Sequence, residues 1–330
     1  MLYALSSLAS DEPKNKYVAV KFCRAGSNPK EVAITIVPSV LNTFTIHGPN
    51  GSHSCYVTVL ARASLSGVKN GSWIRLFQID EARALAAQFV LTVDYVHTQG
   101  IIHGDIHMGN ILLKSILELD LLSIDQLYEK YGVPKLDPVI HLGGKPLPPA
   151  VPSHGIAPLW LGVTSEDITL PEARALLRDF GEVFLYLKQE NYESHAPLAV
   201  RPPEARFEPN KPLSFPSDIW TLACTIWAII AQRPLFEGFL TTEDDMACEY
   251  VDTLGALPPE WWKKWEARQH KFTEDGMPIN RNPYRVQQPR RAAGMPSLDA
   301  KEMDAIFDML RPMLSFRPEN RSTTKQILMS

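Results

Sequence analysis

The segment from Val96 to Leu113 constrains this chain more than any other stretch of its sequence. An apolar pair leads into His-Gly-Asp, four residues follow, and an asparagine then opens a second apolar run. This pattern predicts a loop that holds Asp105 and Asn110 between two short strands. An aspartate can accept the proton of a hydroxyl group, and an asparagine oxygen can bind Mg²⁺, which are two tasks that phosphoryl transfer leaves to the protein. The alternative is an ordinary helix-to-strand connection with polar turn residues.

Composition restricts the kind of protein that can carry this loop. The 330 residues suffice for one large domain or two lobes, and 45% hydrophobic with 21% charged residues indicates a globular chain. The net charge of −4 gives no support to direct nucleic-acid binding, and no apolar run reaches the ~18 residues of a membrane span. Four widely separated cysteines without metal-binding or disulfide spacing indicate thiols in a reducing compartment. We therefore expect a soluble intracellular protein that contacts neither membrane nor nucleic acid.

The residues before the loop predict a small sheet followed by a helix. β-branched and aromatic residues predict strands at Tyr17–Phe22, Thr43–Ile46 and Cys55–Leu60. The turn-rich residues 48–51 join the second strand to the third. Good helix formers with periodic apolar positions then predict a helix over Asp80–His97, which leads into the loop.

The residues after the loop are partly proline-rich and otherwise helical in pattern. A proline-rich stretch from Ser115 to about Thr169 is typical of an inserted segment outside the compact core. Residues 218–231 are apolar nearly all round and predict a buried central helix capped by Ser217 or Asp218. Residues 258–262 and 281–291 are expected to form surface loops, and a last helix is expected near Met303–Leu310.

The order of several motifs matches one family. The chain contains a Val-Ala-Val-Lys strand ending in Lys21, the His103-Gly104-Asp105 to Asn110 loop, Asp179-Phe180-Gly181, Pro202-Pro203-Glu204, Asp218-Ile219-Trp220 and Arg321. In this order they resemble the signatures of the eukaryotic protein kinases, over nearly the whole chain from about Tyr17 to Leu328. The resemblance implies an α+β, two-lobed protein-kinase-like fold. Its small β-rich N-terminal lobe would occupy residues 1–62, and its α-helical C-terminal lobe would occupy residues 63–330, with the insertion at about 115–169.

Within this superfamily the chain is most similar to the SR-protein kinases, particularly to divergent fungal members. The insertion lies between the catalytic loop and Asp179, 74 residues after Asp105, where those kinases place their spacer. The stretch from Asp218 to Glu237, followed by Leu254-Gly255, also resembles theirs. The resemblance implies a monomeric serine/threonine kinase of the cytoplasm and/or nucleus that uses ATP and Mg²⁺ to phosphorylate Ser in Arg/Ser-rich proteins.

The resemblance also implies roles at the reacting groups. Asp105 would orient the substrate hydroxyl and accept its proton, while Asn110 and Asp179 would hold Mg²⁺ against the phosphates of ATP. His107 occupies the position of the lysine that usually neutralises the γ-phosphate, and a histidine is mostly neutral at cytosolic pH. Asp179 could instead be an ordinary turn aspartate.

Further roles are implied around the nucleotide. Lys21 would reach the α- and β-phosphates, held by Glu31. Thr58 would stand at the back of the adenine pocket, and the backbone from Val59 to Ala61 would meet the base. Lys21 could instead be a strand residue that faces water, and Glu31 is followed soon by a proline.

Two further sets of charged residues complete the implied assignments. Glu204 and Arg321 would form a buried structural ion pair. The acidic run Glu243-Asp244-Asp245 could attract an Arg-rich substrate, or it could simply be the solvated start of a helix.

Departures from the kinase pattern keep two alternatives open. No Gly-x-Gly-x-x-Gly precedes Lys21, and only about eleven residues separate Glu31 from the strand at Thr43, so the small lobe is expected to be shortened. Gly104 replaces the arginine that in many kinases binds a phosphorylated activation loop. One alternative is a pseudokinase, a binding module with impaired ATP binding. The other is a small-molecule kinase of the aminoglycoside or choline type, which residues 103–107 also resemble.

Overall fold

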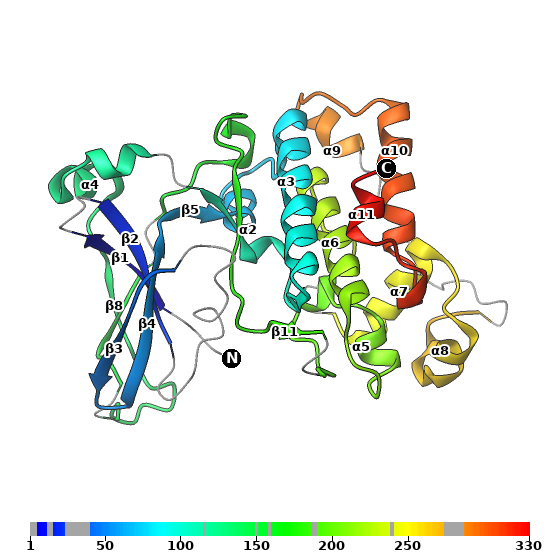
Figure 1. The fold of residues 1–330 in the computed structure, drawn as a ribbon, viewed down its shortest axis with the longest axis horizontal. Helices are drawn as coiled ribbons and strands as arrows, with labels where there is room; N and C mark the ends of the chain where they lie inside the picture. The colour runs from blue at the N-terminus through cyan, green and yellow to red at the C-terminus, as the bar shows by residue number, and fades with distance from the viewer. Residues whose placement is uncertain are drawn as a thin grey trace. The chain divides into compact units, whose positions relative to one another are not determined.

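The computed structural model describes residues 5–11, 16–23, 40–114, 117–148, 151–157, 160–186, 190–237, 241–273 and 287–330. Contacts group the chain into two compact units (Figure 1). The first comprises Met1–Ala63 and Leu112–Val163, and the second comprises Ser64–Ile111 and Thr164–Ser330. The lobe boundaries expected from the sequence stay a prediction.

The first unit contains an antiparallel sheet of four strands in the order β1-β2-β4-β3. The strands are β1 Leu5–Asp11, β2 Lys16–Phe22, β3 Val40–Gly48 and β4 Gly51–Val59. The last three confirm the strands expected from β-branched and aromatic residues. A tight turn joins β3 to β4, and Gly51 has a φ of 115°, which glycine adopts without steric cost. Strand β1, which the sequence pattern did not indicate, pairs with β2 along its whole length.

Part of the proline-rich insertion also has regular structure in this unit. It contains helix α4 Ile124–Tyr131 and a hairpin of β8 Leu136–Pro138 and β9 His154–Ile156. Ser123 begins α4 with a capping box, in which its side chain and that of Gln126 bond each other's backbone N–H groups. The Tyr17 hydroxyl donates to the Leu122 carbonyl at 2.9 Å, so this part of the insertion contacts strand β2.

The second unit is mainly helical. Its helices are α2 Leu65–Asn70, α3 Ile79–Thr98, α5 Glu204–Phe207, α6 Phe215–Ile230, α7 Glu243–Leu254, α8 Pro259–Lys264, α9 Gln287–Ala292, α10 Ala300–Met313 and α11 Thr324–Ile327. Its short strands are β6 Ile101–Ile102, β10 Ala175–Leu177 and β11 Phe184–Leu185. Two further strands, β5 Ala61–Ser64 and β7 Ile111–Lys114, include the chain positions at which one unit passes into the other. Helix α6 is buried on nearly all sides, and α3 packs beside it (Figure 1). The expected central helix and the expected helix before the loop are both confirmed.

The start of α6 differs from the expectation. The helix is capped by Ser214, not by Ser217 or Asp218, and it begins three residues earlier than expected. Pro216 fits the first turn because N–H groups there have no partner within the helix. Ser217 completes the capping box by accepting from Ser214 N–H. Asp218 is therefore left to bond groups outside its own helix.

Two segments expected to be surface loops are helical where the structure describes them. Residues 259–264 form α8, and Trp261 is buried against Phe207 with ring centroids 5.2 Å apart. Of residues 281–291, the first six lie outside the described residues, and the rest belong to α9. Arg290 is buried, and its Nη2 donates to the carbonyls of Phe77 and Ile230. Prolines predicted loops at both places, but packing buries Trp261 of α8 and Arg290 of α9.

The C-terminal helix is also longer than expected, and it is not the last one. Helix α10 includes the whole expected span at Met303–Leu310, and the short helix α11 follows it. In the described part of the chain, no helix has both the length and the apolarity that crossing a bilayer requires.

Candidate active site

The predicted loop lies between two short strands, as expected. Helix α3 ends at Thr98, β6 follows, and the loop closes in a 3₁₀ helix over Met108–Asn110 that leads into β7. Strand β6 pairs with β11, with Phe184 opposite Ile102. The apolar residues on each side of the loop are buried, so the polar residues between them are held from both ends.

The start of the loop is fixed by a carboxylate from α6. Asp218 accepts hydrogen bonds from the backbone N–H groups of His103 at 2.8 Å and Gly104 at 2.9 Å. His97 Nε2, at the end of α3, lies 3.0 Å from the same carboxylate. Burial by itself raises the pKa of Asp218, but the bond from His97 and the other donors lower it below its ordinary value. Asp218 is therefore a charged anchor for the loop backbone.

Gly104 is required by this geometry. Its φ is 77°, a backbone conformation that L side chains rarely adopt. A Cβ at this position would lie 3.2 Å from the carbonyl oxygen of Glu182. The loop conformation thus disfavours the arginine that many kinases carry at this position.

His103 connects the loop to the segment that carries Asp179. Its Nε2 lies 3.1 Å from the Arg178 carbonyl oxygen, and burial lowers the pKa of its imidazole. Arg178 N–H donates to the Asn110 carbonyl at 2.9 Å. Asp179 follows directly with a φ of 65°, a sparsely populated conformation for a residue other than glycine. The structure thus brings the backbone next to Asp179 against Asn110.

Asp105 and Asn110 contact each other directly. Asn110 Nδ2 donates to Asp105 Oδ2 and to the Asp105 backbone oxygen, both at 2.9 Å. Asp105 Oδ1 is buried and accepts no hydrogen bond from the described residues. His107 Nε2 lies 3.6 Å from this Oδ1 atom, a distance too long for a hydrogen bond.

The donor atoms of the loop fit a magnesium ion. Asn110 uses Nδ2 for both contacts with Asp105, which leaves its side-chain oxygen as the ligand-type atom. With Asp179 it gives two oxygen-bearing side chains, and Mg²⁺ in nucleotide sites is commonly held by one or two protein groups plus phosphate oxygens. The described residues contain no cluster of three His, Cys, Asp or Glu side chains suited to a metal held by protein alone.

The residues expected around the nucleotide lie in the first unit. Lys21 is opposite Tyr56 in the β2–β4 register, with Nζ 5.5 Å from the centre of the tyrosine ring. Thr58 is two residues further along β4, so it shares a face of the sheet with Lys21. Val59 ends β4 and Ala61 begins β5. Glu31 lies outside the described residues.

The expected buried ion pair is confirmed. Arg321 Nη2 lies 2.6 Å from Glu204 Oε2, and both side chains are almost completely buried. Arg321 also donates to the carbonyls of Ser315 and Pro216, and Ser217 Oγ donates to Glu204. Both charged groups therefore have several hydrogen-bond partners, which is the condition under which a buried pair is tolerated.

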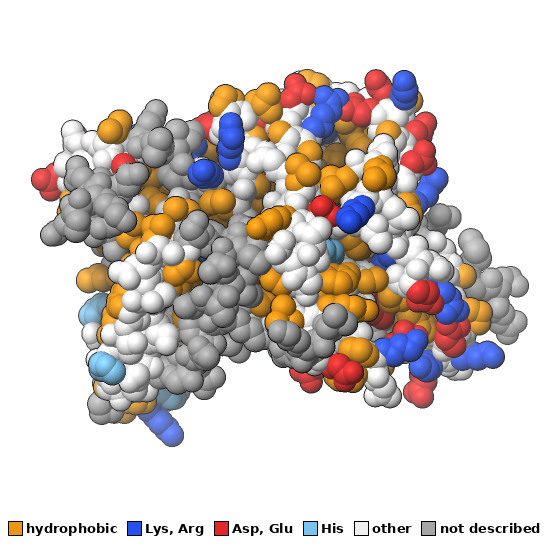
Figure 2. Space-filling model, viewed as in Figure 1, with side chains coloured by type: hydrophobic (Ala, Val, Ile, Leu, Met, Phe, Trp, Pro, Cys, Tyr) orange, Lys and Arg blue, Asp and Glu red, His pale blue; other side chains and the backbone are white. Residues whose placement is uncertain are grey.

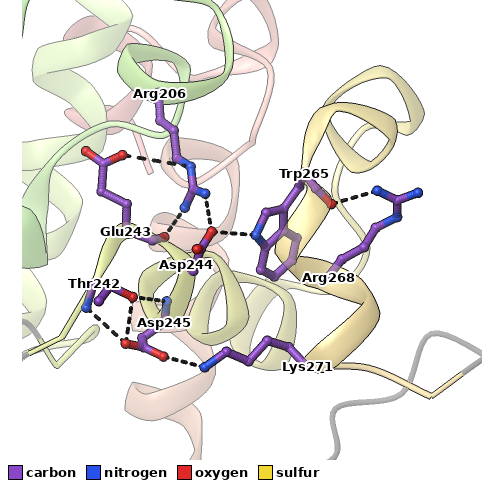
Figure 3. A network of polar contacts seen from close by, with 8 residues as sticks. All are labelled: Arg206, Thr242, Glu243, Asp244, Asp245, Trp265, Arg268 and Lys271. Atoms are coloured by element: carbon purple, nitrogen blue, oxygen red, sulfur yellow. Dashed lines mark hydrogen bonds and ion pairs between the residues drawn. The ribbon is translucent and has the colours of Figure 1, made fainter.

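The acidic run is the first turn of α7, and its three carboxylates already have cationic partners (Figure 3). These partners are Arg201 and Arg206 for Glu243, Arg206 for Asp244, and Lys271 for Asp245. Thr242 caps the helix by accepting from Asp245 N–H. On the face shown in Figure 2, acidic and basic side chains of the helical unit are likewise interspersed. Of the two interpretations of the acidic run, the start of a helix describes this segment.

The sequence interpretation gave no functional role to three residues that make specific hydrogen bonds in this unit. His97 contacts Asp218, Gly109 N–H donates to His107 Nδ1, and Lys69 contacts the end of α6. His97 was taken only as the end of a helix, Gly109 carried no role, and Lys69 was not singled out. Lys69 is buried and donates to the carbonyls of Ala228 and Ala231 at the end of α6. None of the three positions carried a local signal in the sequence, because Lys69 stands between Val68 and the polar Asn70, and the contacts of all three residues depend on the fold.

Comparison with known proteins finds protein kinases that are similar to this chain in sequence. No family model matches the chain. Serine/threonine-protein kinase AFC1 of Arabidopsis thaliana is 24% identical over 341 residues, covering 96% of this chain and 65% of the relative. The probable serine/threonine-protein kinase sky1 of Dictyostelium discoideum is 35% identical over 98 residues, covering 29% of this chain and 15% of the relative. Protein kinase dsk1 of Schizosaccharomyces pombe is 26% identical over 126 residues, covering 32% of this chain and 23% of the relative. The chain thus matches less than two thirds of the length of each of these three relatives.

A solved kinase domain has the same fold. Its crystal structure matches 99% of this chain and 90% of its own with a TM-score of 0.59 and 14% sequence identity. The α+β protein-kinase fold expected from the sequence is thereby confirmed, and the named relatives are protein kinases. The chain therefore has the protein-kinase fold and is similar in sequence to protein kinases, which supports the resemblance to the SR-protein kinases expected from the sequence.

Proposed function

We propose that this chain is an ATP-dependent protein serine/threonine kinase. The observation that carries the proposal is the state of the Asp105 carboxylate. Its Oδ2 atom is held by Asn110, whereas its Oδ1 atom is buried and accepts no hydrogen bond from the described residues. A buried acceptor without a donor is costly in a structural role, and a substrate hydroxyl would supply the donor.

The chemistry follows from that acceptor. The hydroxyl oxygen of a Ser or Thr would attack the γ-phosphorus, its proton would pass to Asp105, and the bond to the bridging β–γ oxygen would break to release ADP. The proposal assigns Asn110 and Asp179 to Mg²⁺, which supplies charge stabilisation when bound. The hydrogen bond from Arg178 N–H to the Asn110 carbonyl supports the assignment, because it holds the segment that carries Asn110 beside the segment that carries Asp179.

The nucleotide assignments belong to the same proposal. Lys21 would contact the α- and β-phosphates with Glu31 as its partner, and Thr58, Val59 and Ala61 would surround the adenine. The shared face of Lys21 and Thr58 on the sheet supports this set.

The substrate class rests on the resemblance to SR-protein kinases, which implies Ser in Arg/Ser-rich proteins. It also implies a monomer of the cytoplasm or nucleus. The acidic run at the start of α7 adds little support, because its carboxylates are paired within the chain. An Arg-rich substrate would have to displace Arg206 or Lys271 to use them.

Transfer of labelled phosphate from Mg²⁺-ATP to an Arg/Ser-repeat peptide tests the proposal. We expect transfer by the parent protein and a loss of at least about 100-fold in Asp105→Ala and in Asp179→Ala. Asp137→Ala, which removes an exposed carboxylate from β8, is the matched control and should keep full activity. Absence of transfer by the parent would overturn the proposal.

The pseudokinase alternative is favoured by one observation, the absence of glycine from residues 1–21 before and within the β1–β2 hairpin. Thermal-shift measurement with Mg²⁺-ATP separates the two functions. Stabilisation by the nucleotide without transfer to any hydroxyl substrate would identify a binding module, and stabilisation with transfer would identify the kinase.

A further inference from the structure

The imidazole of His107 is held in a defined orientation and tautomer. Its Nδ1 atom accepts a hydrogen bond from Gly109 N–H at 3.0 Å. An imidazole nitrogen that accepts a hydrogen bond carries no proton, so the proton of the neutral ring is on Nε2. The backbone thereby decides which nitrogen of His107 can donate.

Gly109 makes this ring position sterically possible. A Cβ at residue 109 would lie 2.6 Å from His107 Cε1 and 2.8 Å from Nδ1, closer than real Cβ atoms approach other groups. The backbone of Gly109 does not have a positive φ, so the need for glycine comes from space rather than from conformation. An alanine at this position would therefore displace the ring while leaving the imidazole itself intact.

The protonated nitrogen faces the reacting carboxylate. His107 Nε2 lies 3.6 Å from Asp105 Oδ1, the oxygen without a hydrogen-bond donor among the described residues. Asn110 already fixes the other oxygen, Oδ2. Catalytic hydrogen bonds are often long before substrate binds and shorten in the complex. A carboxylate oxygen can accept two hydrogen bonds, so Oδ1 can accept from His107 and from a substrate hydroxyl together.

We propose that His107 is a positioning residue that acts through Asp105: its Nε2–H donates to Oδ1 in the substrate complex and fixes the plane of the carboxylate. Gly109 is the residue that permits this contact. This role differs from neutralising the γ-phosphate, the task of the lysine that kinases usually have at this position. The kinetic consequence rests on the proposed kinase function, whereas the hydrogen-bond geometry does not.

The chain contains a matched local control. Gly143 N–H donates to His141 Nδ1 at 2.9 Å, and a Cβ at residue 143 would lie 3.2 Å from that ring. His141 therefore has the same His-x-Gly contact as His107, but it is exposed in the insertion. Substitutions of His141 and Gly143 therefore show the effect of losing the His-x-Gly hydrogen bond at a site that has no role in the proposed reaction.

Nuclear magnetic resonance of isotope-labelled histidine tests the geometry without any turnover. We expect His107 to carry its proton on Nε2, and we expect Asp105→Asn to shift the Nε2 resonance of His107 but not that of His141. Gly109→Ala should remove the preference for this tautomer. A proton on Nδ1 in the parent, or no response of His107 to Asp105→Asn, would overturn the proposal.

Kinetics of phosphate transfer test the consequence. We expect kcat to fall about 10- to 100-fold in His107→Leu and in Gly109→Ala, because a small misplacement of a catalytic group has effects of this size. His107→Gln, which keeps a donor near the position of Nε2, should retain more activity than His107→Asn. The double change His107→Leu with Gly109→Ala should be no slower than either single change. His141→Leu and Gly143→Ala should have no effect.

Calorimetric affinities for Mg²⁺-ATP and Mg²⁺-ADP separate this role from a contact with the γ-phosphate. The ratio of the two dissociation constants should be the same in the parent and in His107→Leu, and a tenfold change in that ratio would contradict the proposal. If the parent transfers no phosphate, the proposed kinase function fails, and the resonance measurement alone then decides the His107 contact. A thermal midpoint within about 2 °C of the parent shows that each variant is folded.

Discussion

The helical unit contains two polar networks built from the same kinds of side chain but with very different burial. In the buried set, Glu204 pairs with Arg321, and Asp218 anchors the backbone of the loop that contains Asp105. In the surface network, Arg206 and Lys271 neutralise the first turn of α7 (Figure 3). The surface side chains remain 23% to 52% exposed, whereas those of Arg321 and Asp218 are almost fully covered.

The difference shows that burial, rather than the number of ion pairs, decides what such a network does. Water solvates and screens the exposed pairs, so breaking one leaves each charge hydrated. A buried charge that loses its partner has neither protein nor water to compensate it. The buried Asp218 can therefore hold the loop that contains Asp105 in place, while the surface network mainly balances the charge of an acidic helix start. Four measurements test this contrast, in order of decreasing expected effect.

The largest effect is expected at the buried ion pair. Arg321→Met should lower the free energy of unfolding by about 3–5 kcal/mol, because Glu204 would remain buried without its cation. Denaturant titration measures the change. Replacing both residues together, as in Glu204→Leu with Arg321→Met, should cost less than Arg321→Met alone. A loss below about 1 kcal/mol in the single variant would show that this pair behaves like a surface pair.

A smaller but still large effect is expected at the loop anchor. Asp218→Asn removes the carboxylate charge, and one of the two oxygens that accept from His103 and Gly104 becomes an amide nitrogen. That nitrogen is itself a donor, so it cannot accept the backbone N–H that faces it. Bonds to charged groups contribute about 1.5–3 kcal/mol each, so we expect a loss of about 2–3 kcal/mol in unfolding free energy. Phosphate transfer by this variant should fall as well, because the loop would lose its fixed position. Unchanged stability with unchanged transfer would exclude the anchoring role.

The buried Lys69, whose hydrogen bonds among the described residues are to carbonyl groups and not to a carboxylate, gives a pH-dependent effect. Burial, together with the nearby Arg290 and Arg75, lowers the pKa of Lys69 to about 7. The unfolded chain holds this proton up to about pH 10.5, so the unfolded state binds more protons above pH 7 and stability rises with pH. Relative to Lys69→Met, the parent should gain about 1–2 kcal/mol between pH 7 and pH 8.5. Parallel pH profiles of the two proteins would show that Lys69 does not titrate in this range.

The smallest effect is expected in the surface network. Lys271→Met should change the free energy of unfolding by at most about 1 kcal/mol, and the difference from the parent should shrink further at high salt. The hydrogen bond that Thr242 N–H donates to the Asp245 carboxylate stays in place in this variant. A loss of more than about 2 kcal/mol in the free energy of unfolding would show that exposed and buried ion pairs contribute similarly to the stability of this protein.

Much of the fold and of the candidate site could be predicted from local sequence pattern. Strands β2 to β4 and helices α3 and α6 follow from side-chain types and periodicity, which act over a few residues. The expected Asp105 and Asn110 are in direct contact. The helix α8 and the start of α6 were predicted wrongly, because prolines that break helices in their interior are favourable in a first turn.

The sequence by itself determined the order of the motifs that resemble those of kinases, the loop that brings Asp105 and Asn110 together, and the identity of the buried ion pair. The tertiary structure alone decided which charges are compensated and how the loop is held. Asp218 accepts hydrogen bonds from His103 and Gly104 more than a hundred residues away, and the acids of α7 form ion pairs with Arg206 and Lys271. The reason is that the strength of a polar contact depends on burial, and burial results from packing between segments that no local pattern brings together.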